Sequence, residues 1–242
     1  TVVFTIPVAM GILREEDRPV MAKGILCGIV TIPLGVLAGG LTAGFPLPMV
    51  LRNLVPIVLI ALLIALGLWR AENAMVRGFE VFGKLVVAVA TVGLAAAIGE
   101  ALTGYPIIRG MEPISEGFET VGVIAIVLAG AFPLVFVLTK LLRKPLLAAG
   151  GLLGINDAAA AGLLASLANS IAAFGMVKDM NERGKVVNIA FAVSGAFVFG
   201  DHLGFTAGFA PEMMGAMIVG KLVGGLTAIA AAWILTRKSE KA

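Results

Sequence analysis

Seven residues between positions 156 and 206 carry side chains that could do chemistry inside apolar stretches of the chain. An amide or hydroxyl there can bind an alcohol or an ammonium group, a carboxylate can hold a cation, and an imidazole can handle a proton near neutral pH. Such groups are costly within membrane segments and are typical of pathways and binding sites. The candidate substrate-binding residues are Asn156, Asp157, Asn169, Ser170, Asp201, His202 and Thr206.

Asp201 and His202 stand between the flexible residues Gly200 and Gly204, and Thr206 adds a further oxygen nearby. One interpretation is a pair that binds a cation or handles a proton. The alternative is a polar helix end that faces lipid headgroups. The first is favoured because this histidine is the only one in the chain.

The other candidates also have structural interpretations. Asn156 and Asp157 could cap a helix at a hairpin tip, or could bring a carboxylate to a helix end inside the membrane. Asn169 and Ser170 could bind a substrate, or could make an interhelical hydrogen bond worth about 1 kcal/mol. Lys221 is predicted to pair with a buried carboxylate, Asp201 or Asp157, in a mainly structural role.

The elements that position these residues are transmembrane helices. The chain is 60% hydrophobic with a mean hydropathy of +1.05. Only 14% of its residues are charged, against about 25% in soluble domains. Several apolar runs approach the ~20 residues that cross a bilayer as a helix. We therefore predict an all-α polytopic transmembrane bundle. The expected spans are 20–45, 54–69, 79–102, 118–139, 186–205 and 215–235.

Other classes of protein are disfavoured. The single cysteine, Cys27, lies in an apolar run, so neither a disulfide framework nor a metal-thiolate set is expected. There is no metal-ligand spacing, nucleotide-binding loop or G-x-S-x-G motif. The net charge of +3 comes from basic residues in short loops and does not indicate nucleic-acid binding. We expect no catalytic residues, no cofactor, no metal and no enzyme activity.

Basic residues set the expected orientation. Nine of them fall in the loops at 14–23, 70–84 and 140–144, whereas the loops at 46–53 and 103–118 contain only Arg52 and Arg109. By the positive-inside rule the first set of loops is cytoplasmic.

The segment 146–177 is too long for one simple span and too short for two. Basic residues flank it on both sides, so we predict a re-entrant hairpin that turns near GINDAAAAG. The alternative is one long tilted helix.

A weak repeat pairs Phe4-Thr5 with Phe205-Thr206 and Lys23 with Lys221. It predicts an inverted-repeat secondary transporter. Residues 1–53 would end a first repeat that is truncated at its N-terminus. Residues 54–145 would form a scaffold, and 146–242 a second repeat that contains the hairpin and the spans 186–205 and 215–235.

The block INDAAAAGLLASLANSIAAFGMVKDMNERGKVVNIAFAVSGAFVFGDHLGF resembles the C-terminal signature of the bacterial ethanolamine utilization permease family. The segments TVVFTIPVAMGIL, GIVTIPLGVLAGG and IVGKLVGGLTAIA resemble other parts of that family. The resemblance implies uptake of ethanolamine across the bacterial cytoplasmic membrane for its catabolism. It also implies an N-terminal portion that this chain lacks, and the chain could form a homo-oligomer.

The substrate fits the candidate residues, because ethanolamine is a small ammonium with one hydroxyl. The expected mechanism is alternating access, in which the 146–205 unit moves against the 54–139 scaffold. Two alternatives stay open. One is a proton- or sodium-coupled symporter of another small amine or nucleoside-like solute, and the other is a non-transporting membrane sensor or assembly subunit.

Overall fold

Helices and their connecting turns make up the computed structural model of the chain, which describes residues 9, 12–13 and 15–239. No strand occurs in these residues, which confirms the all-α prediction. The segment Thr1–Thr5, on which the predicted Phe-Thr repeat partly depends, lies outside the described residues. Within this described part of the chain, five helical segments are long and apolar enough to cross a membrane: Pro19–Thr42, Leu47–Ala71, Asn73–Thr103, Ile114–Leu153 and Pro211–Arg237. They overlap five of the six spans expected from the sequence.

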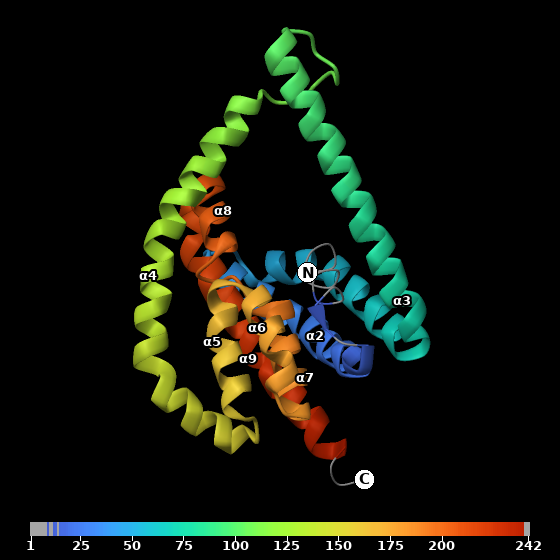
Figure 1. The fold of residues 1–242 in the computed structure, drawn as a ribbon, viewed down its shortest axis with the longest axis vertical. Coiled ribbons are helices and arrows are strands. Elements are labelled where there is room, and N and C mark those ends of the chain that lie inside the picture. The colour runs from blue at the N-terminus through green and yellow to red at the C-terminus, as the bar shows by residue number, and fades with distance from the viewer. Residues whose placement is uncertain (1–8, 10–11, 14, 240–242) are drawn as a thin grey trace.

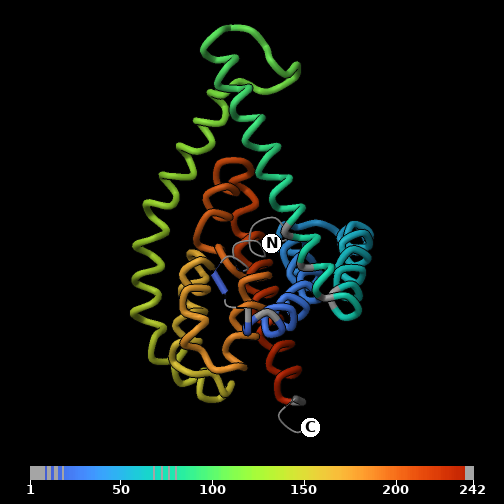
Figure 2. Tube along the Cα trace, turned by 45° about the vertical axis from the view of Figure 1, so that its right-hand side comes forward, coloured from blue at the N-terminus to red at the C-terminus, as the bar shows by residue number. Residues whose placement is uncertain are grey.

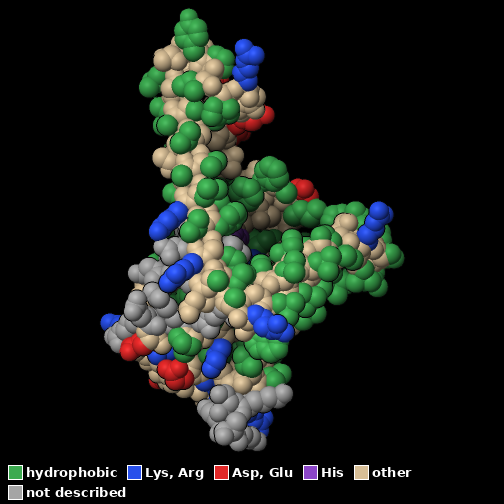
Figure 3. Space-filling view, turned by 90° about the vertical axis from the view of Figure 1, so that its right-hand side faces the viewer, with side chains coloured by type: hydrophobic (Ala, Val, Ile, Leu, Met, Phe, Trp, Pro, Cys, Tyr) green, Lys and Arg blue, Asp and Glu red, His purple; other side chains and the backbone are tan. Residues whose placement is uncertain are grey.

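The two longest helices, α3 (Leu47–Thr103) and α4 (Ile114–Leu153), form the sides of a tall inverted V. They meet at the loop 104–113, at the top of Figure 1. Ala71 breaks the helical geometry of α3 with φ −145° and ψ 51°, so that α3 consists of two helical segments joined at a kink. Exposed hydrophobic side chains occur along both arms, and Figure 3 shows them spread over the face of the molecule on which α3 lies. Such a surface suits contact with lipid or with other apolar protein segments.

The best-packed part of the molecule is formed by α2 (Arg18–Thr42), α7 (Glu182–Ser194) and α9 (Met214–Ser239). Glycines allow α2 to lie directly against α7. A Cβ added to Gly24 would be 2.6 Å from Cβ of Ile189, and one added to Gly28 would overlap the side chain of Val193. All but one of the α7 residues from Val186 to Val193 have side chains that are buried and apolar; the exception is the buried Asn188.

A helical hairpin precedes α7. It comprises α5 (Asp157–Ala168), α6 (Ser170–Met176) and the short 3-10 helix η2 (Val177–Asp179). Asn156 caps α5, because its Oδ1 accepts the N–H of Ala159 at 3.2 Å. Its Nδ2 donates to the carbonyl of Asp179 at 2.8 Å, so the two ends of the hairpin lie together.

The predicted hairpin 146–177 is therefore misplaced in its boundaries and its turn. Residues 146–153 complete α4, and the stretch near Ile155–Asp157 forms the base of the hairpin instead of its tip. The tip is Asn169, whose extended backbone (φ −156°, ψ 122°) separates α5 from α6. The same break excludes a single long helix across 146–177.

The segment expected as one span over 186–205 is also interrupted. α7 ends at Ser194, residues 195–200 form turns, and α8 (Asp201–Phe209) begins after them. Another 3-10 helix, η3 (Pro211–Met213), then leads into α9. The apolar composition of 186–205 suggested a continuous helix. Two backbone features account for the interruption: Phe197 has a positive φ of 62°, and Gly200 has φ −127° and ψ −138°, which lie outside the helical region.

An ion pair joins Asp17, the residue just before α2, to Lys185 in the first turn of α7. Lys185 Nζ is 2.7 Å from Asp17 Oδ1 and 3.1 Å from Glu182 Oε1. The side chains of Lys185 and Asp17 are only 13% and 4% exposed, whereas that of Glu182 is 77% exposed. The hydrogen bond to Asp17 raises the pKa of Lys185 above its ordinary value of 10.5.

We expect Asp17→Asn to lower the free energy of unfolding by about 2 kcal/mol, because it leaves a mostly buried ammonium with only the exposed Glu182 as partner. The raised pKa means that the pair is fully formed below pH 10.5 and is lost as the pH rises above it. The difference in stability should therefore persist through neutral pH and shrink only in strong alkali. Thermal unfolding in detergent measures it. Glu182→Gln is the control and should cost less than about 1 kcal/mol; an equal cost in both variants would contradict the assignment.

Candidate functional site

The tip of the hairpin meets the interruption between α7 and α8, and we call this contact the junction. The N–H of Phe197 donates to the carbonyl of Ser166 at 2.9 Å, and the N–H of Phe199 donates to the carbonyl of Leu167 at 2.9 Å. These bonds satisfy carbonyls at the end of α5 that have no partner within the helix. Two interrupted helices, distant in sequence, thus complete each other's backbone hydrogen bonding. Figure 2 shows the hairpin and the interrupted segment beside one another within the V.

Two of the candidate residues are at the tip. Asn169 Oδ1 accepts the N–H of Ile171 at 2.8 Å and so caps α6. This bond leaves the amide Nδ2 as the group that can donate to a ligand. Ser170 follows Asn169 and is fully buried. On the opposite side of the junction, Gly200 lies against the carbonyl of Ala168 with no space for a side chain, and Asp201 follows it. Asn169 and Asp201 are each one residue away from this contact.

Buried hydroxyl groups without partners adjoin the tip. The Oγ atoms of Ser166 and Ser170 have no hydrogen bond, although both residues are 0% exposed. An unpaired buried polar group costs about 1 to 3 kcal/mol, so such a group calls for an explanation. Ser166 was not among the candidates drawn from the sequence. The sequence does contain a signal for this residue, because Ser166 and Ser170 are four residues apart and lie on either side of Asn169.

Lys221 and His202 form a pair beside the junction. Lys221 Nζ is 2.8 Å from His202 Nδ1, and the His202 ring also has a backbone hydrogen bond at Ala196. The rings of His202 and Phe197 are 5.3 Å apart. The expectation that Lys221 pairs with Asp201 or Asp157 is therefore wrong: its partner in the structure is the imidazole. Because an ammonium can only donate, His202 Nδ1 is the acceptor of the hydrogen bond from Lys221 Nζ.

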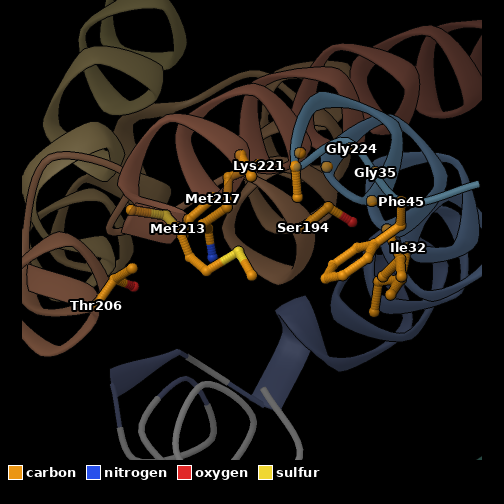
Figure 4. Close-up of a pocket in the computed structure, with 15 residues that line it drawn as sticks. Ile32, Gly35, Phe45, Ser194, Thr206, Met213, Met217, Lys221 and Gly224 are labelled. Atoms are coloured by element: carbon orange, nitrogen blue, oxygen red, sulfur yellow. The ribbon is translucent and has the colours of Figure 1, made fainter. Parts of the chain in front are cut away.

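Thr206 lies further along α8, where its Oγ1 donates to the carbonyl of His202 at 2.7 Å. Together with Lys221 and Ser194 it lines a cavity of about 420 Å³ between α2, α8 and α9 (Figure 4). The other residues of the cavity wall are glycine or apolar, Ile32, Met213 and Met217 among them. Thr206 thus faces a largely apolar space that adjoins the Lys221–His202 pair.

Asn156 and Asp157 are not at the junction. They begin α5, and its 12 residues place them about 18 Å from the tip. The expectation that Asp157 converges with Asp201 is thus not met, because the turn that follows α4 is the hairpin base. Asn156 has the capping role that its position suggested, and Asp157 lines a second cavity of about 430 Å³ with Thr139 and Arg143.

A polar network closes the hairpin base. Asn181 Oδ1 accepts the N–H groups of Asn156 and Gly184 at 3.3 and 3.0 Å, and its Nδ2 donates to the carbonyl of Gly154 at 2.8 Å. Asn188, which the sequence analysis also missed, is fully buried and donates to the carbonyls of Ala159 and Gly184 at 2.9 and 3.0 Å. These asparagines fasten α5 to α7 at a distance from the junction.

Chemically, the residues at the junction and next to it in the chain carry groups that suit a small polar cation. They supply one carboxylate at the start of α8, one amide at the tip, two buried hydroxyls and the carbonyl ends of α5 and α7. In the described part of the chain no three His, Cys, Asp or Glu side chains cluster as metal ligands. The geometry suits binding and release more than covalent chemistry.

The fold and the junction define a polytopic α-helical membrane protein with two interrupted helices that meet inside the bundle. Residues 1–235 match the family model described as "Ethanolamine utilisation protein, EutH", and the chain belongs to this family. No solved structure matches the chain.

Curated relatives match the whole chain or nearly so. It is 59% identical over 241 residues to the "Probable ethanolamine permease EutH" of Listeria monocytogenes, with 100% of the chain covered. It is 53% identical over 241 residues to the "Uncharacterized protein YxeR" of Bacillus subtilis, with 99% covered. A "Probable ethanolamine permease EutH" of Salmonella typhimurium is 46% identical over 265 residues, with 100% covered. The chain spans 65% of the length of each of these relatives.

The close backbone contact at Gly200 gives a test of the junction. We expect Gly200→Ala to lower the free energy of unfolding by about 2 kcal/mol, because the new methyl group would overlap the carbonyl oxygen of Ala168 and part the two backbones. Thermal unfolding in detergent is the measurement. Gly208→Ala is a matched control in α8, since its Cβ would be an ordinary 3.6 Å from Val123. Equal stability of the two variants would exclude the tight contact.

Proposed function

We propose that this chain contains the substrate site of an ethanolamine permease of the bacterial cytoplasmic membrane, and that the site is the junction. The observation that carries the proposal is the meeting of two interrupted helices beside unpaired buried hydroxyls. Secondary transporters hold substrates near the middle of the membrane, where discontinuous helices expose backbone and side-chain polar groups. Membership in the EutH family and the printed names of the relatives support ethanolamine as the substrate.

Each end of ethanolamine has a counterpart at the junction. The ammonium needs anionic or carbonyl oxygen, which Asp201 and the carbonyl ends of α5 and α7 supply. The negative end of a helix dipole adds to this attraction. The substrate hydroxyl needs a donor and an acceptor, which the Asn169 amide and the hydroxyls of Ser166 and Ser170 supply. A charge-assisted hydrogen bond to the carboxylate is the strongest of these contacts.

Access to the site requires the junction to open. Ser166 and Ser170 are inaccessible in the structure, and two backbone hydrogen bonds hold the tip against residues 197 and 199. Separation of the tip would uncover the hydroxyls and free the carbonyls of Ser166 and Leu167 for the ammonium. Substrate contacts then replace the protein contacts of these two carbonyls and give the unpaired hydroxyls of Ser166 and Ser170 a partner. This exchange makes the junction a gate as well as a binding site.

The proposal predicts that Asp201→Asn raises the KM for ethanolamine uptake about ten- to hundredfold, since it removes the negative charge opposite the ammonium. Saturable uptake of radiolabelled ethanolamine into proteoliposomes that contain the full-length protein is the measurement. Asp157→Asn is the matched control, because this carboxylate is at the other end of α5 and should leave the KM within about twofold. A normal KM in the Asp201 variant would remove that residue from the site.

The unpaired hydroxyls allow a sharper test. Ser166→Ala and Ser170→Ala remove groups that have no partner in the structure, so the variants should be as stable as the native protein or more so. Ligand roles predict that each nevertheless raises the KM by about tenfold. Ser194→Ala is the control for the effect on stability. Ser194 Oγ donates to the carbonyl of Gly28 at 2.6 Å, so its loss should lower the free energy of unfolding by about 1 kcal/mol. An unchanged KM with unchanged stability would show that the two hydroxyls are not ligands.

Substrate identity is tested in the same vesicles. Unlabelled ethanolamine should compete fully with the labelled substrate, and choline should compete weakly, because its three methyl groups block hydrogen bonding by the ammonium. Equal competition by both would indicate a broader amine carrier. No uptake above empty liposomes by folded protein would overturn the proposal.

A further inference from the structure

α2 and α9 contain the same sequence. Residues 35–43 read GVLAGGLTA and residues 220–228 read GKLVGGLTA, so seven of nine positions are identical at a separation of 185 residues. This alignment makes Lys221 equivalent to Val36. It therefore differs from the weak repeat described above, which pairs Lys221 with Lys23. The first copy ends one residue after the span Pro19–Thr42, and the second lies within the span Pro211–Arg237. A shared nine-residue segment could arise in two unrelated helices, so its contacts must decide its meaning.

The two copies cross each other at their first glycines. A Cβ added to Gly35 would be 2.6 Å from the carbonyl oxygen of Gly220, and a Cβ added to Gly220 would be 2.9 Å from the carbonyl oxygen of Gly35. Each residue therefore meets its own counterpart. This arrangement is the one that a two-fold rotation through the crossing point produces.

Neighbouring contacts obey the same relation. A Cβ on Gly35 would be 3.1 Å from Cα of Gly224, and a Cβ on Gly220 would be 3.3 Å from Cα of Gly39. These two contacts interchange when each residue is replaced by its equivalent 185 positions away. As the residue number increases along α2, that of the facing residue in α9 decreases, so the helices cross in opposite directions.

A third pair of contacts obeys the same two-fold relation, although the groups that touch are different. Thr31 Oγ1 is 3.4 Å from the carbonyl oxygen of Gly224. The equivalent contact joins Gly39 to Ala216, where a Cβ on Gly39 would be 3.0 Å from the carbonyl oxygen of Ala216. Sequence identity alone does not require reciprocal contacts over two helical turns.

The cavity beside the crossing is lined by equivalent positions from both helices (Figure 4). Its wall contains four such pairs: Ile32 with Met217, Gly35 with Gly220, Val36 with Lys221, and Gly39 with Gly224. Val36 and Lys221 differ most among these equivalent positions, because one side chain is apolar and the other is charged. The bond between Lys221 and His202 therefore belongs to one copy alone.

We infer that α2 and α9 are equivalent helices of an inverted repeat, and that the pseudo-two-fold axis runs between Gly35 and Gly220. Its part in transport rests on the proposed function. In inverted-repeat carriers the two repeats exchange conformations to alternate access. Glycines let the two backbones touch at the axis, so the helices can pivot there without a side chain between them. Lys221 and His202 break the symmetry and distinguish the two conformations.

Spin-label distances test the axis. In a Cys27→Ala background, cysteines are placed in the full-length protein at the exposed positions Leu34, Leu41, Val219 and Leu226. Leu34 with Val219 is an equivalent pair, so symmetry requires its distance to be the same in both conformations. The pairs Leu34–Leu226 and Leu41–Val219 are related by the axis, so their distances must interchange between conformations. Electron paramagnetic resonance is recorded in detergent and in liposomes, in each case with and without ethanolamine, and uptake into the liposomes is measured for each variant.

The expected result is an unchanged Leu34–Val219 distance. The pairs Leu34–Leu226 and Leu41–Val219 should each show the same two distances, and ethanolamine should shift the populations of these distances in opposite directions in the two pairs. A shift in Leu34–Val219, or independent changes in the other pairs, would overturn the symmetry. Uptake without any change in the three pairs would overturn the role of the axis while leaving the proposed function intact. Absent uptake would count against the proposed function alone, and the comparison between detergent and liposomes would then test the axis.

Discussion

The structure depends on the need to satisfy backbone groups where helices are interrupted in apolar surroundings. Two interruptions in the described helices, at Asn169 and over residues 195–200, free carbonyl and N–H groups that lipid cannot accommodate. The breaks meet, so that Phe197 and Phe199 donate to the carbonyls of Ser166 and Leu167. Neither break would be tolerable without the other. The junction is for this reason a constrained part of the fold, and in the proposed function it is the part that exchanges protein contacts for substrate contacts.

A second constraint acts at the α2–α9 crossing, where glycine permits direct contact between backbones. The consequence is a close approach of Gly35 to Gly220 and a cavity beside it that receives Lys221 and Thr206. The Lys221–His202 pair connects this cavity to α8 and, through the ring of Phe197, to the junction. We therefore expect a movement of α2 against α9 at the proposed axis to displace the hairpin tip. Such coupling would connect the proposed symmetry of the two helices to the proposed gate.

Several features could be anticipated because they follow from local composition. Apolar length predicts the spans, and the EutH family model and named relatives agree with the resemblance seen in the residues 156–205. Asn156 was recognisable as a helix cap because asparagine before a run of alanines favours that role. The hairpin turn was misplaced for the same reason: a strong capping signal at 156 was taken for the tip, and Asn169 has a weaker sequence pattern. Ser166 was overlooked because a serine in an alanine-rich helix gives no sign of being unpaired.

What the sequence determines alone is the class of the protein. Long apolar segments, basic loops and a distinctive block of residues specify a polytopic helical membrane protein of one family, since hydrophobic length and charge act locally along the chain. The tertiary structure decided which polar residues meet. It sets Gly200 against Ala168, the neighbours of Asp201 and Asn169 in the chain, gives Lys221 the imidazole of His202 instead of a carboxylate, and leaves Asp157 at the far end of α5. These outcomes depend on where helices break and cross, and a break is stable only when a distant segment supplies the missing hydrogen bonds.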